Sequence, residues 1–453
     1  MILFENNLDE KKITILGMKK SGYHAALLAS KFRANIFVSD SGEDKIIKIH
    51  YAKLTKIGVK CEIGGHTEKI FSSDFWITSP GVPKDADIVK KAKKLEIPII
   101  SEIEFASRFT TLPIIAVTGS NGKSTTVSIM NEMLDTKDYK PILAGNIGTP
   151  FSKAVLDLLN GDLMGNIFVL EISSFQLEFV DEFHPSISVF LNISPDHLDR
   201  HKNMDEYLKM KLHMINNTNE NDYVIYNSDD EILNKSFKDS VAKIIPYGLN
   251  GKNKFFSLND TIVYDEDNNT LIPINKIPLK GKHNLSNLIA SATVAKILKI
   301  NNFKIKRTME YFSGIKHRLQ FVKTINGSDY INDSKATNIS SVIAAIDSFN
   351  SPIILLLGGK NKDSDFRLLL PHTKRHVKHI VSFGEAGGEI ATAIGDAVRL
   401  STTSSLNQAV ASAHELANPG EIILMSPGCA SFDEFKNFED RGENFINIVN
   451  KLN

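Results

Sequence analysis

The stretch VTGSNGKSTT, residues 117–126, follows a short apolar run, LPIIA, and contains the Gly-Lys-Ser of a phosphate-binding loop. A standard loop of this kind reads G-x-x-x-x-G-K-[ST], whereas only two residues separate Gly119 from Gly122 here. Glycines let the backbone approach a phosphate, a lysine neutralises its charge, and a hydroxyl can bind a metal ion. The apolar run predicts a strand before the loop, and VSIMNEML predicts a helix after it. The sequence therefore predicts a working nucleotide loop of unusual spacing.

The composition is that of a globular protein with several domains. The chain has 453 residues, of which 42% are hydrophobic and 23% charged. Lys+Arg and Asp+Glu number 53 each, which indicates neither a nucleic-acid partner nor a polybasic membrane anchor. Two cysteines, Cys61 and Cys429, form no zinc or redox motif. With no signal-peptide pattern and no membrane-length apolar run, we expect a cytoplasmic protein without membrane insertion.

Short apolar runs alternate with helix-length amphipathic segments, which is the βαβ pattern of parallel sheets. We expect an α/β protein with a Rossmann-like domain at 1–109, a central P-loop ATPase-type domain at 110–314 and a second Rossmann-like domain at 315–453. Ligands of open α/β sheets bind at the carboxyl ends of the strands. Helices are expected near 21–32 and 285–299. Strands are expected at 12–17, 35–40, 59–65, 74–80, 97–101, 113–119, 166–171, 186–194, 222–228, 352–359, 377–385 and 421–428.

A phosphate-binding loop has a companion acid at the end of a buried strand, where a low dielectric strengthens its hold on Mg²⁺. Glu171 closes the apolar run NIFVLE and matches that position, although an acid at a strand end can also simply begin a loop. His197, in SPDHLDRH, follows another apolar strand toward the same end of the sheet. A lone loop histidine is more often just solvated.

The segment MDEYLKMKLHMI, residues 204–215, places a lysine on an apolar face. Helical spacing puts Tyr207 and Met214 on one stripe with Lys211 in its middle. Lys209 lies on the acidic face, as an ordinary surface lysine should. Lys211 either extends its ammonium to solvent or is desolvated, which lowers its pKa and leaves a reactive neutral amine. The spacing alone leaves both interpretations open.

Several stretches together resemble motifs of the Mur ligase family, in that family's order. TGSNGKST resembles its ATP loop, whose shorter spacing is a family feature. Two stretches, NDSKATN at 332–338 and SPGCASFDEFKNFEDRG at 426–442, resemble the branch of the family that adds D-glutamate. The other matching stretches are AGNIG at 144–148, EISSFQLE at 171–178, DHLD at 196–199, GKHNLSN at 281–287 and the His317-Arg318 pair.

The resemblance implies a monomeric, cytoplasmic, ATP-dependent amide ligase of peptidoglycan precursor synthesis. It would join D-glutamate to the L-alanine carboxylate of UDP-MurNAc-L-alanine through an acyl phosphate. Negative charge gathers in both transition states, so Lys123 and two Mg²⁺ ions would supply most of the stabilisation. The resemblance also implies that Lys211 is carbamylated, which turns its cation into an anion for the second Mg²⁺.

The resemblance assigns roles to residues throughout the chain. The catalytic residues would be Lys123, Glu171, His197 and Lys211, and the metal ligands Ser124, Glu171, His197 and Lys211. ATP would contact Gly119, Ser120, Asn121, Gly122, Lys123, Ser124, Thr125, Asn284, Asn287, His317, Arg318 and Asp333. The two other substrates would contact Ser21, Asp40, Ser41, Ser79, Gly81, Asn146, His197, Lys335, Thr337, Lys362, Ser431, Phe432 and Phe438.

Purely structural roles compete with several of these assignments. Asn146 and the Ser79-Pro80-Gly81 run can be turn residues, and Asn284 and Asn287 can cap a helix. The alternative for the trio His317, Arg318 and Asp333 is surface pairing, and for Phe432 and Phe438 it is core packing.

The first domain departs most from known nucleotide patterns. A dinucleotide fingerprint needs glycine where GMKKSG, residues 17–22, has Lys19, which argues against NAD and permits a uridine diphosphate. Well-known family members carry an arginine after an Asp-Thr pair. This chain has Gly42 after the corresponding pair, Asp40-Ser41. Lys19 or Lys20 is expected either to replace that contact or to be a solvated charge.

Two kinds of rival remain. Within the fold, the chain could be a folylpolyglutamate synthase or a Mur ligase for alanine or a diamino acid, but NDSKATN and Lys362 favour D-glutamate. The other class is a nucleotide-binding regulator that uses the loop as a switch. Such a regulator would not need Glu171, His197 and Lys211 together, nor an amino-acid-binding third domain.

Overall fold

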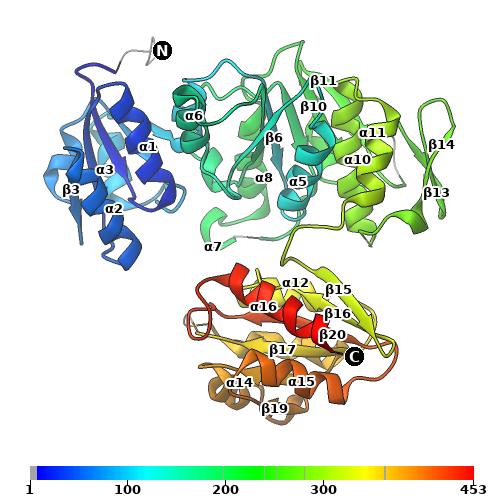
Figure 1. The fold of residues 1–453 in the computed structure, drawn as a ribbon. Coiled ribbons are helices and arrows are strands. Elements are labelled where there is room, and N and C mark those ends of the chain that lie inside the picture. The colour runs from blue at the N-terminus through cyan, green and yellow to red at the C-terminus, as the bar shows by residue number, and fades with distance from the viewer. Residues whose placement is uncertain are drawn as a thin grey trace. The chain divides into compact units, whose positions relative to one another are not determined.

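The computed structural model describes residues 8–196, 198–238, 240–250, 253–279, 281–361 and 364–452. It divides into two compact units, Met1–Phe312 and Ser313–Asn453, and each is described here by itself (Figure 1). The division lies close to the boundary predicted at residue 314. Among the described residues, no helix combines the length and apolar character needed to cross a membrane.

The first sheet lies in the first unit and has five parallel strands in the order β3-β2-β1-β4-β5. The strands are β1 (Lys12–Leu16), β2 (Asn35–Asp40), β3 (Lys60–Ile63), β4 (Phe75–Thr78) and β5 (Ile99–Ser101). The accompanying helices are α1 (Lys20–Lys31), α2 (Lys45–Lys56), η1 (Glu68–Phe71), α3 (Asp87–Lys94) and α4 (Glu102–Ser107). These elements confirm the strands predicted there and the helix predicted near 21–32.

The second sheet, also in the first unit, has six parallel strands in the order β11-β10-β9-β6-β8-β7. Its strands are β6 (Ile114–Thr118), β7 (Pro141–Gly145), β8 (Ile167–Glu171), β9 (Ile187–Phe190), β10 (Tyr223–Asn227) and β11 (Lys243–Tyr247). β6, β8 and β9 are buried along their whole length, as near-continuous apolar runs require.

Helices cover this sheet, and α5 and α10 lie side by side on it (Figure 1). The helices are α5 (Lys123–Leu134), α6 (Phe151–Asn160), η2 (Phe175–Leu177), α7 (Leu198–His201), α8 (Met204–Leu212), η3 (His213–Ile215), α9 (Leu233–Ser236), η4 (Ile274–Lys276), α10 (Lys282–Ile297) and α11 (Asn302–Tyr311). A small antiparallel sheet joins β12 (Ser257–Leu258), β13 (Ile262–Tyr264) and β14 (Thr270–Pro273). The sequence pattern did not predict this small sheet.

Glu104 of α4 connects the first sheet to the second. Its side chain is fully buried, and its Oε2 accepts the N–H groups of residues 181–183 at 2.7–3.0 Å. Oε1 accepts a hydrogen bond from Arg108 Nε at 2.7 Å. Glu102, on the same helix, accepts the N–H of Ser152 at 2.7 Å. Buried carboxylates are stable only when they are hydrogen-bonded in this way, so the junction is specific.

The second unit contains a third sheet in the order β15-β16-β20-β17-β18-β19, in which only the β15–β16 pair is antiparallel. Its strands are β15 (Gln320–Ile325), β16 (Ser328–Asn332), β17 (Ile353–Gly358), β18 (Val377–Phe383), β19 (Leu400–Thr402) and β20 (Ile422–Gly428). The helices are α12 (Ile339–Ile346), η5 (Phe366–Leu369), α13 (Leu370–His376), α14 (Gly387–Ile394), η6 (Gly395–Ala397), α15 (Leu406–Leu416) and α16 (Phe438–Lys451). The α/β architecture built on three sheets is therefore confirmed.

Candidate active site

The predicted nucleotide loop connects β6 to α5, at the carboxyl end of an interior strand of the second sheet. Gly119 and Gly122 have φ of +157° and +84°, which side-chain-bearing residues rarely adopt. The N–H groups of residues 120–121 are held by Asn192, at 2.9 Å to its carbonyl oxygen and 2.8 Å to its Oδ1. α5 begins at Lys123, and the start of a helix attracts anions. The loop therefore has the strand–loop–helix arrangement of a phosphate-binding loop, with the N–H groups of residues 120 and 121 already bonded to Asn192.

The lysine of the loop closes over its own backbone. Lys123 Nζ donates hydrogen bonds to the carbonyl oxygens of Gly119 and Ser120, both at 2.8 Å. Ser124 and Thr125 follow in the first turn of α5, with Ser124 buried and Thr125 half-buried. The ammonium is thus already held beside the position that a bound phosphate would take.

Helix α10 supports the loop from one side through Asn287. This side chain is 5% exposed, and a Cβ added to Gly122 would lie only 2.5 Å from its Oδ1. The hydroxyl of Ser291 donates to the carbonyl oxygen of Thr126 at 3.3 Å, which fixes α10 against α5. α10 begins after Gly281, which has no side chain to cap it; Asn284 is half-buried in the first turn of the helix.

Glu171 ends β8 directly beside the loop strand, because its backbone pairs with Val117 of β6. The carboxylate is 3% exposed, and its Oε1 accepts a hydrogen bond from Asn146 Nδ2 at 2.7 Å. Its Oε2 is buried without a hydrogen-bond partner in the described part of the chain. An unpartnered buried carboxylate oxygen next to the hydroxyl-bearing start of α5 fits Mg²⁺, which prefers oxygen ligands. Asn146, a predicted substrate residue, therefore contacts the predicted metal ligand Glu171.

Lys211 of α8 lies beneath the loop and is 1% exposed. Its Nζ donates to the carbonyl oxygen of Gly119 at 3.0 Å and lies 4.5 Å from the centre of the Tyr207 ring. Burial, reinforced by the charge of Lys123, lowers the pKa of Lys211 to about 7. The interpretation in which Lys211 extends to solvent is wrong, whereas Lys209 is exposed as predicted.

Two predicted site residues, His197 and Lys362, lie outside the described residues. Within the described ranges, no three His, Cys, Asp or Glu side chains gather as a metal-ligand group. Of the predicted metal set, Ser124, Glu171 and Lys211 are described. Ser124 and Glu171 supply oxygen donors, and Lys211 would supply them only once its amine is modified.

The predicted residues of the first sheet gather at the carboxyl ends of β1, β2 and β4. Asp40 organises this edge, since its Oδ2 accepts the N–H of Met18 at 2.7 Å and its Oδ1 that of Gly42 at 2.8 Å. The hydroxyl of Ser79 lies 3.4 Å from the carbonyl oxygen of Gly17. Of the other predicted contacts here, Ser21 is half-buried and Ser41 and Gly81 are exposed.

The two lysines that open α1 have different partners. Lys19 pairs with Asp44 at 2.9 Å, and both side chains are largely exposed. Lys20 donates to the carbonyl oxygen of Gly148, in the AGNIG turn of the second sheet. Lys20 therefore points from the first sheet toward the predicted substrate turn, whereas Lys19 is engaged locally.

In the second unit, the predicted ATP residues surround the end of β16. His317 is 4% exposed and its Nδ1 lies 3.0 Å from Asn332 Nδ2. Asp333 is 4% exposed, accepts the hydroxyl of Ser426 at 2.8 Å, and burial raises its pKa to about 7. Surface pairing is therefore the wrong explanation for these two residues, although Arg318 is exposed.

The residues predicted on the D-glutamate side lie on the adjoining loops. Lys335 donates its backbone N–H to the carbonyl oxygen of His317 at 2.9 Å, and Thr337 follows it, half-buried. Ser431 is buried. Core packing is wrong for Phe432, whose side chain is 64% exposed. Phe438 is half-buried, with its ring centre 6.4 Å from that of His317.

Arg441 is a residue of this region that the sequence analysis did not single out. It is fully buried and donates to Ser334 Oγ at 3.0 Å and to the carbonyl oxygen of Cys429 at 3.1 Å. It thereby ties the NDSKATN loop to the SPGCAS loop. The buried residues Arg441, Phe445 and Val449 share one face of α16 at helical spacing, a signal that could have revealed it.

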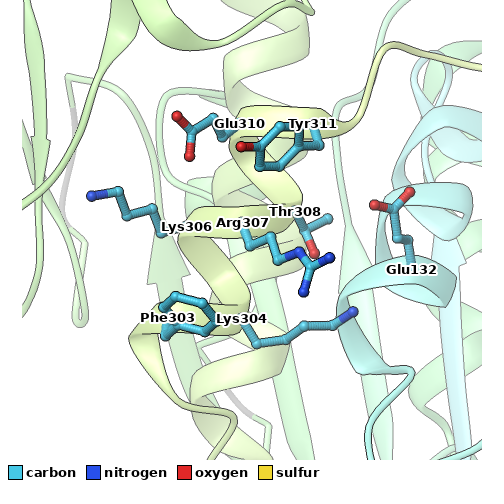
Figure 2. Close-up of a pocket in the computed structure, with 8 residues that line it drawn as sticks. All are labelled: Glu132, Phe303, Lys304, Lys306, Arg307, Thr308, Glu310 and Tyr311. Carbon is cyan, nitrogen blue, oxygen red and sulfur yellow. The ribbon is translucent and has the colours of Figure 1, made fainter.

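The hollow drawn in Figure 2 lies elsewhere, on the outer face of α11. Its volume is about 690 Å³, and Figure 2 shows the exposed rings of Phe303 and Tyr311 with Arg307 between them. Glu132 of α5 faces them from the other side. It shares no residue with the predicted active site.

Comparison with known proteins defines the class. Family models match residues 12–88 as the MurD N-terminal domain, 117–295 as the Mur ligase middle domain and 317–429 as the Mur ligase glutamate ligase domain. The solved structure of MurF from Acinetobacter baumannii is 16% identical with a TM-score of 0.58, covering 98% of this chain and 94% of that one. UDP-N-acetylmuramate–alanine ligase of Thermotoga maritima gives a TM-score of 0.55 at 16% identity, covering 97% and 99%. The fold is the three-domain fold of the Mur ligases.

Curated relatives narrow the class. A UDP-N-acetylmuramoylalanine–D-glutamate ligase of Christiangramia forsetii is 38% identical over 98% of this chain and 100% of its own length. The enzyme of the same name from Salinibacter ruber is 36% identical, over 97% of this chain and 98% of its own. The chain therefore belongs to the family of UDP-N-acetylmuramoylalanine–D-glutamate ligases. This membership favours the D-glutamate branch over the other Mur ligases, folylpolyglutamate synthases and regulatory switches.

Replacement of Gly122 by alanine tests the fit of the loop against Asn287. Gly161→Ala is the matched control, because Gly161 has a similar φ of +78° but nothing within 4 Å of an added Cβ. The backbone strain costs about 1–2 kcal/mol at either position. Only Gly122→Ala adds a collision 2.5 Å from Asn287 Oδ1. We expect thermal unfolding to show a clearly lower midpoint for Gly122→Ala; equal midpoints would contradict this account.

Proposed function

We propose that this chain uses ATP to join D-glutamate to the L-alanine carboxylate of UDP-MurNAc-L-alanine, lengthening a peptidoglycan precursor by one amide bond. The observation that carries the proposal is the unpartnered buried oxygen of Glu171 beside the start of α5 and Lys123, in a chain of this family. As the resemblance to the family implies, the enzyme is proposed to act in the cytoplasm as a monomer.

The proposed reaction proceeds in two steps. The substrate carboxylate is a poor electrophile, so one of its oxygens first attacks the γ-phosphorus of ATP, releasing ADP and forming an acyl phosphate. The amine of D-glutamate then attacks the acyl carbon, and inorganic phosphate leaves. Both steps concentrate negative charge, which Lys123 and the N-terminus of α5 are placed to stabilise. Mg²⁺, when bound, neutralises part of the charge of the transferred phosphoryl group.

The metal side of the proposal involves two Mg²⁺ ions. Ser124 and Glu171 would hold one of them through their oxygens. His197 and Lys211 would hold the other, with Lys211 carbamylated by CO₂. Support for this modification comes from the burial of the Lys211 amine and its pKa of about 7, since only a neutral amine attacks CO₂.

The substrate side draws on both units. The polar edge around Asp40 and Ser79 would bind the uridine diphosphate, and Asn146 would contact the same substrate. His317, Arg318 and Asp333 would complete the ATP site. D-glutamate would be held by Lys335, Thr337, Lys362, Ser431, Phe432 and Phe438.

Amino-acid selectivity tests the proposed reaction. We expect purified protein supplied with ATP, Mg²⁺ and UDP-MurNAc-L-alanine to release phosphate when D-glutamate is added, but not with L-alanine or diaminopimelate. Lys123→Met is the control, because it removes the charge that faces the phosphates and should abolish release without unfolding the chain. Equal release with L-alanine or diaminopimelate would defeat the proposal.

Carbamylation of Lys211 is tested by ¹³C NMR in ¹³CO₂-enriched buffer. We expect a carbamate signal in the wild type and in Lys209→Met, whose lysine is exposed, and none in Lys211→Met. The folded pKa lies near 7, below the usual value of 10.5, so the amine is protonated below that pH and neutral above it. At constant dissolved CO₂ the signal should therefore grow as the pH rises through about 7. Full activity of Lys211→Met would contradict the proposed role.

A further inference from the structure

Arg200 of α7, a short helix, contacts residues that belong to both sheets of the first unit. Its Nε and Nη2 donate to the two carboxylate oxygens of Glu178 at 2.9 and 2.6 Å. Its side chain is 14% exposed and that of Glu178 is fully buried. The guanidinium also lies over the ring of Phe175, 4.8 Å from its centre. These contacts hold the guanidinium in one orientation.

The same guanidinium reaches the first sheet. Nη2 donates to the carbonyl oxygen of Val82 at 2.9 Å and lies 3.4 Å from that of Pro80. Both carbonyls belong to the turn that follows β4, which is closed by a hydrogen bond from the Val82 N–H to the Ser79 carbonyl at 3.0 Å. This turn contains Ser79 and Gly81, the predicted contacts of the uridine side.

The 79–84 turn packs against the loop that precedes α1. The N–H of Ser79 donates to the carbonyl oxygen of Leu16 at 2.9 Å, and a Cβ added to Gly17 would lie 2.7 Å from Ser79 Oγ. A shift of the turn would therefore displace the Gly17 loop as well. Arg200 thus supports the whole carboxyl edge where the nucleotide diphosphate is proposed to bind.

A second ionic contact connects the same turn to the metal side. Lys84, the last residue of the 79–84 turn, pairs with Glu206 of α8, and both side chains are about one-quarter exposed (25% and 23%). α8 also carries Lys211. Glu178 itself ends the segment that starts at Glu171. The turn at 79–84 is therefore fastened to both segments that carry proposed metal-side residues.

We propose that Arg200 is a positioning residue that holds the 79–84 turn in the conformation that binds the uridine diphosphate of the sugar-nucleotide substrate. It contacts no reacting atom and acts through the carbonyls of Pro80 and Val82. The inference deepens the proposed function and rests on it for the identity of the ligand. Glu178 orients the guanidinium through two hydrogen bonds. The guanidinium then donates a further hydrogen bond to the Val82 carbonyl oxygen in the turn.

Arginine is needed here for its shape as well as its charge. Its planar fork binds a carboxylate with two parallel hydrogen bonds and still has N–H groups left for carbonyl oxygens. A lysine offers one point charge and cannot satisfy Glu178 and the turn together. The Arg200→Lys variant should therefore fold and keep an ion pair with Glu178, but it should lose the hydrogen bond to the turn.

The experiment measures the affinity of Arg200→Lys and Arg200→Met for UDP-MurNAc-L-alanine by calorimetry, and the KM of each substrate. We expect binding of UDP-MurNAc-L-alanine to weaken by about tenfold in Arg200→Met and by less in Arg200→Lys, the typical effect of losing charge-assisted hydrogen bonds. The KM values for ATP and D-glutamate should change by less than about twofold, because those sites keep their contacts.

Arg108→Met is the matched control, since Arg108 also belongs to a buried ion pair at the junction of the two sheets but bonds Glu104 instead of the turn. It should lower the unfolding midpoint without weakening UDP-MurNAc-L-alanine binding. Glu178→Gln serves as a milder second variant, because the amide keeps one acceptor for the guanidinium; it should weaken binding by less than Arg200→Met.

Two results would overturn the inference. One is unchanged UDP-MurNAc-L-alanine affinity in Arg200→Met and Glu178→Gln. The other is an equal loss in Arg108→Met, which would mean that general destabilisation is the cause. Calorimetry needs no turnover, so the positioning role can fail while D-glutamate ligation holds, and the ligation can fail while the positioning role holds.

Discussion

The first unit depends on one buried carboxylate. Glu104 accepts three backbone N–H groups of residues 181–183 and a hydrogen bond from Arg108, and it does so without contact with solvent. A buried charge is tolerated only with such a full set of partners, so the chain can satisfy Glu104 in one arrangement. That arrangement joins the first sheet to the second. Lys20, Lys84 and Arg200 make further contacts between the same two sheets.

Parallel sheets explain why so few residues can build a reactive centre. Every strand of the second sheet runs in the same direction, so β6 and β8 end at one edge and deliver the loop and Glu171 side by side. α8 then brings Lys211 beneath the loop. Both side chains are buried. Oε2 of Glu171 has no hydrogen-bond partner among the described residues, and burial favours the neutral form of the Lys211 amine.

Prediction from sequence succeeded where local pattern determines structure. Apolar runs located many of the strands, but β7, β11, β15, β16 and β19 were not among the predicted ranges. Helical spacing showed that Lys211 is unusual, although spacing could not decide between solvent exposure and burial. Contacts between distant segments were beyond reach: the pairing of Asn146 with Glu171 and the fork of Arg200 appear only once the sheets are assembled. The strands β12–β14, which are two to four residues long, also lie outside the predicted strands. All the predicted site roles stay predictions, and His197 and Lys362 also lie outside the described residues.

The order of the strands along the chain has a consequence for synthesis. Each of the three large sheets is closed within one contiguous stretch of sequence, with no strand borrowed from another. The unit ending at Phe312 is therefore complete before Ser313 and its successors leave the ribosome. Domains generally fold as units in the order in which they are made. The nascent chain can thus bury its long parallel strands stepwise, which limits the time that their unpaired edges are open to aggregation.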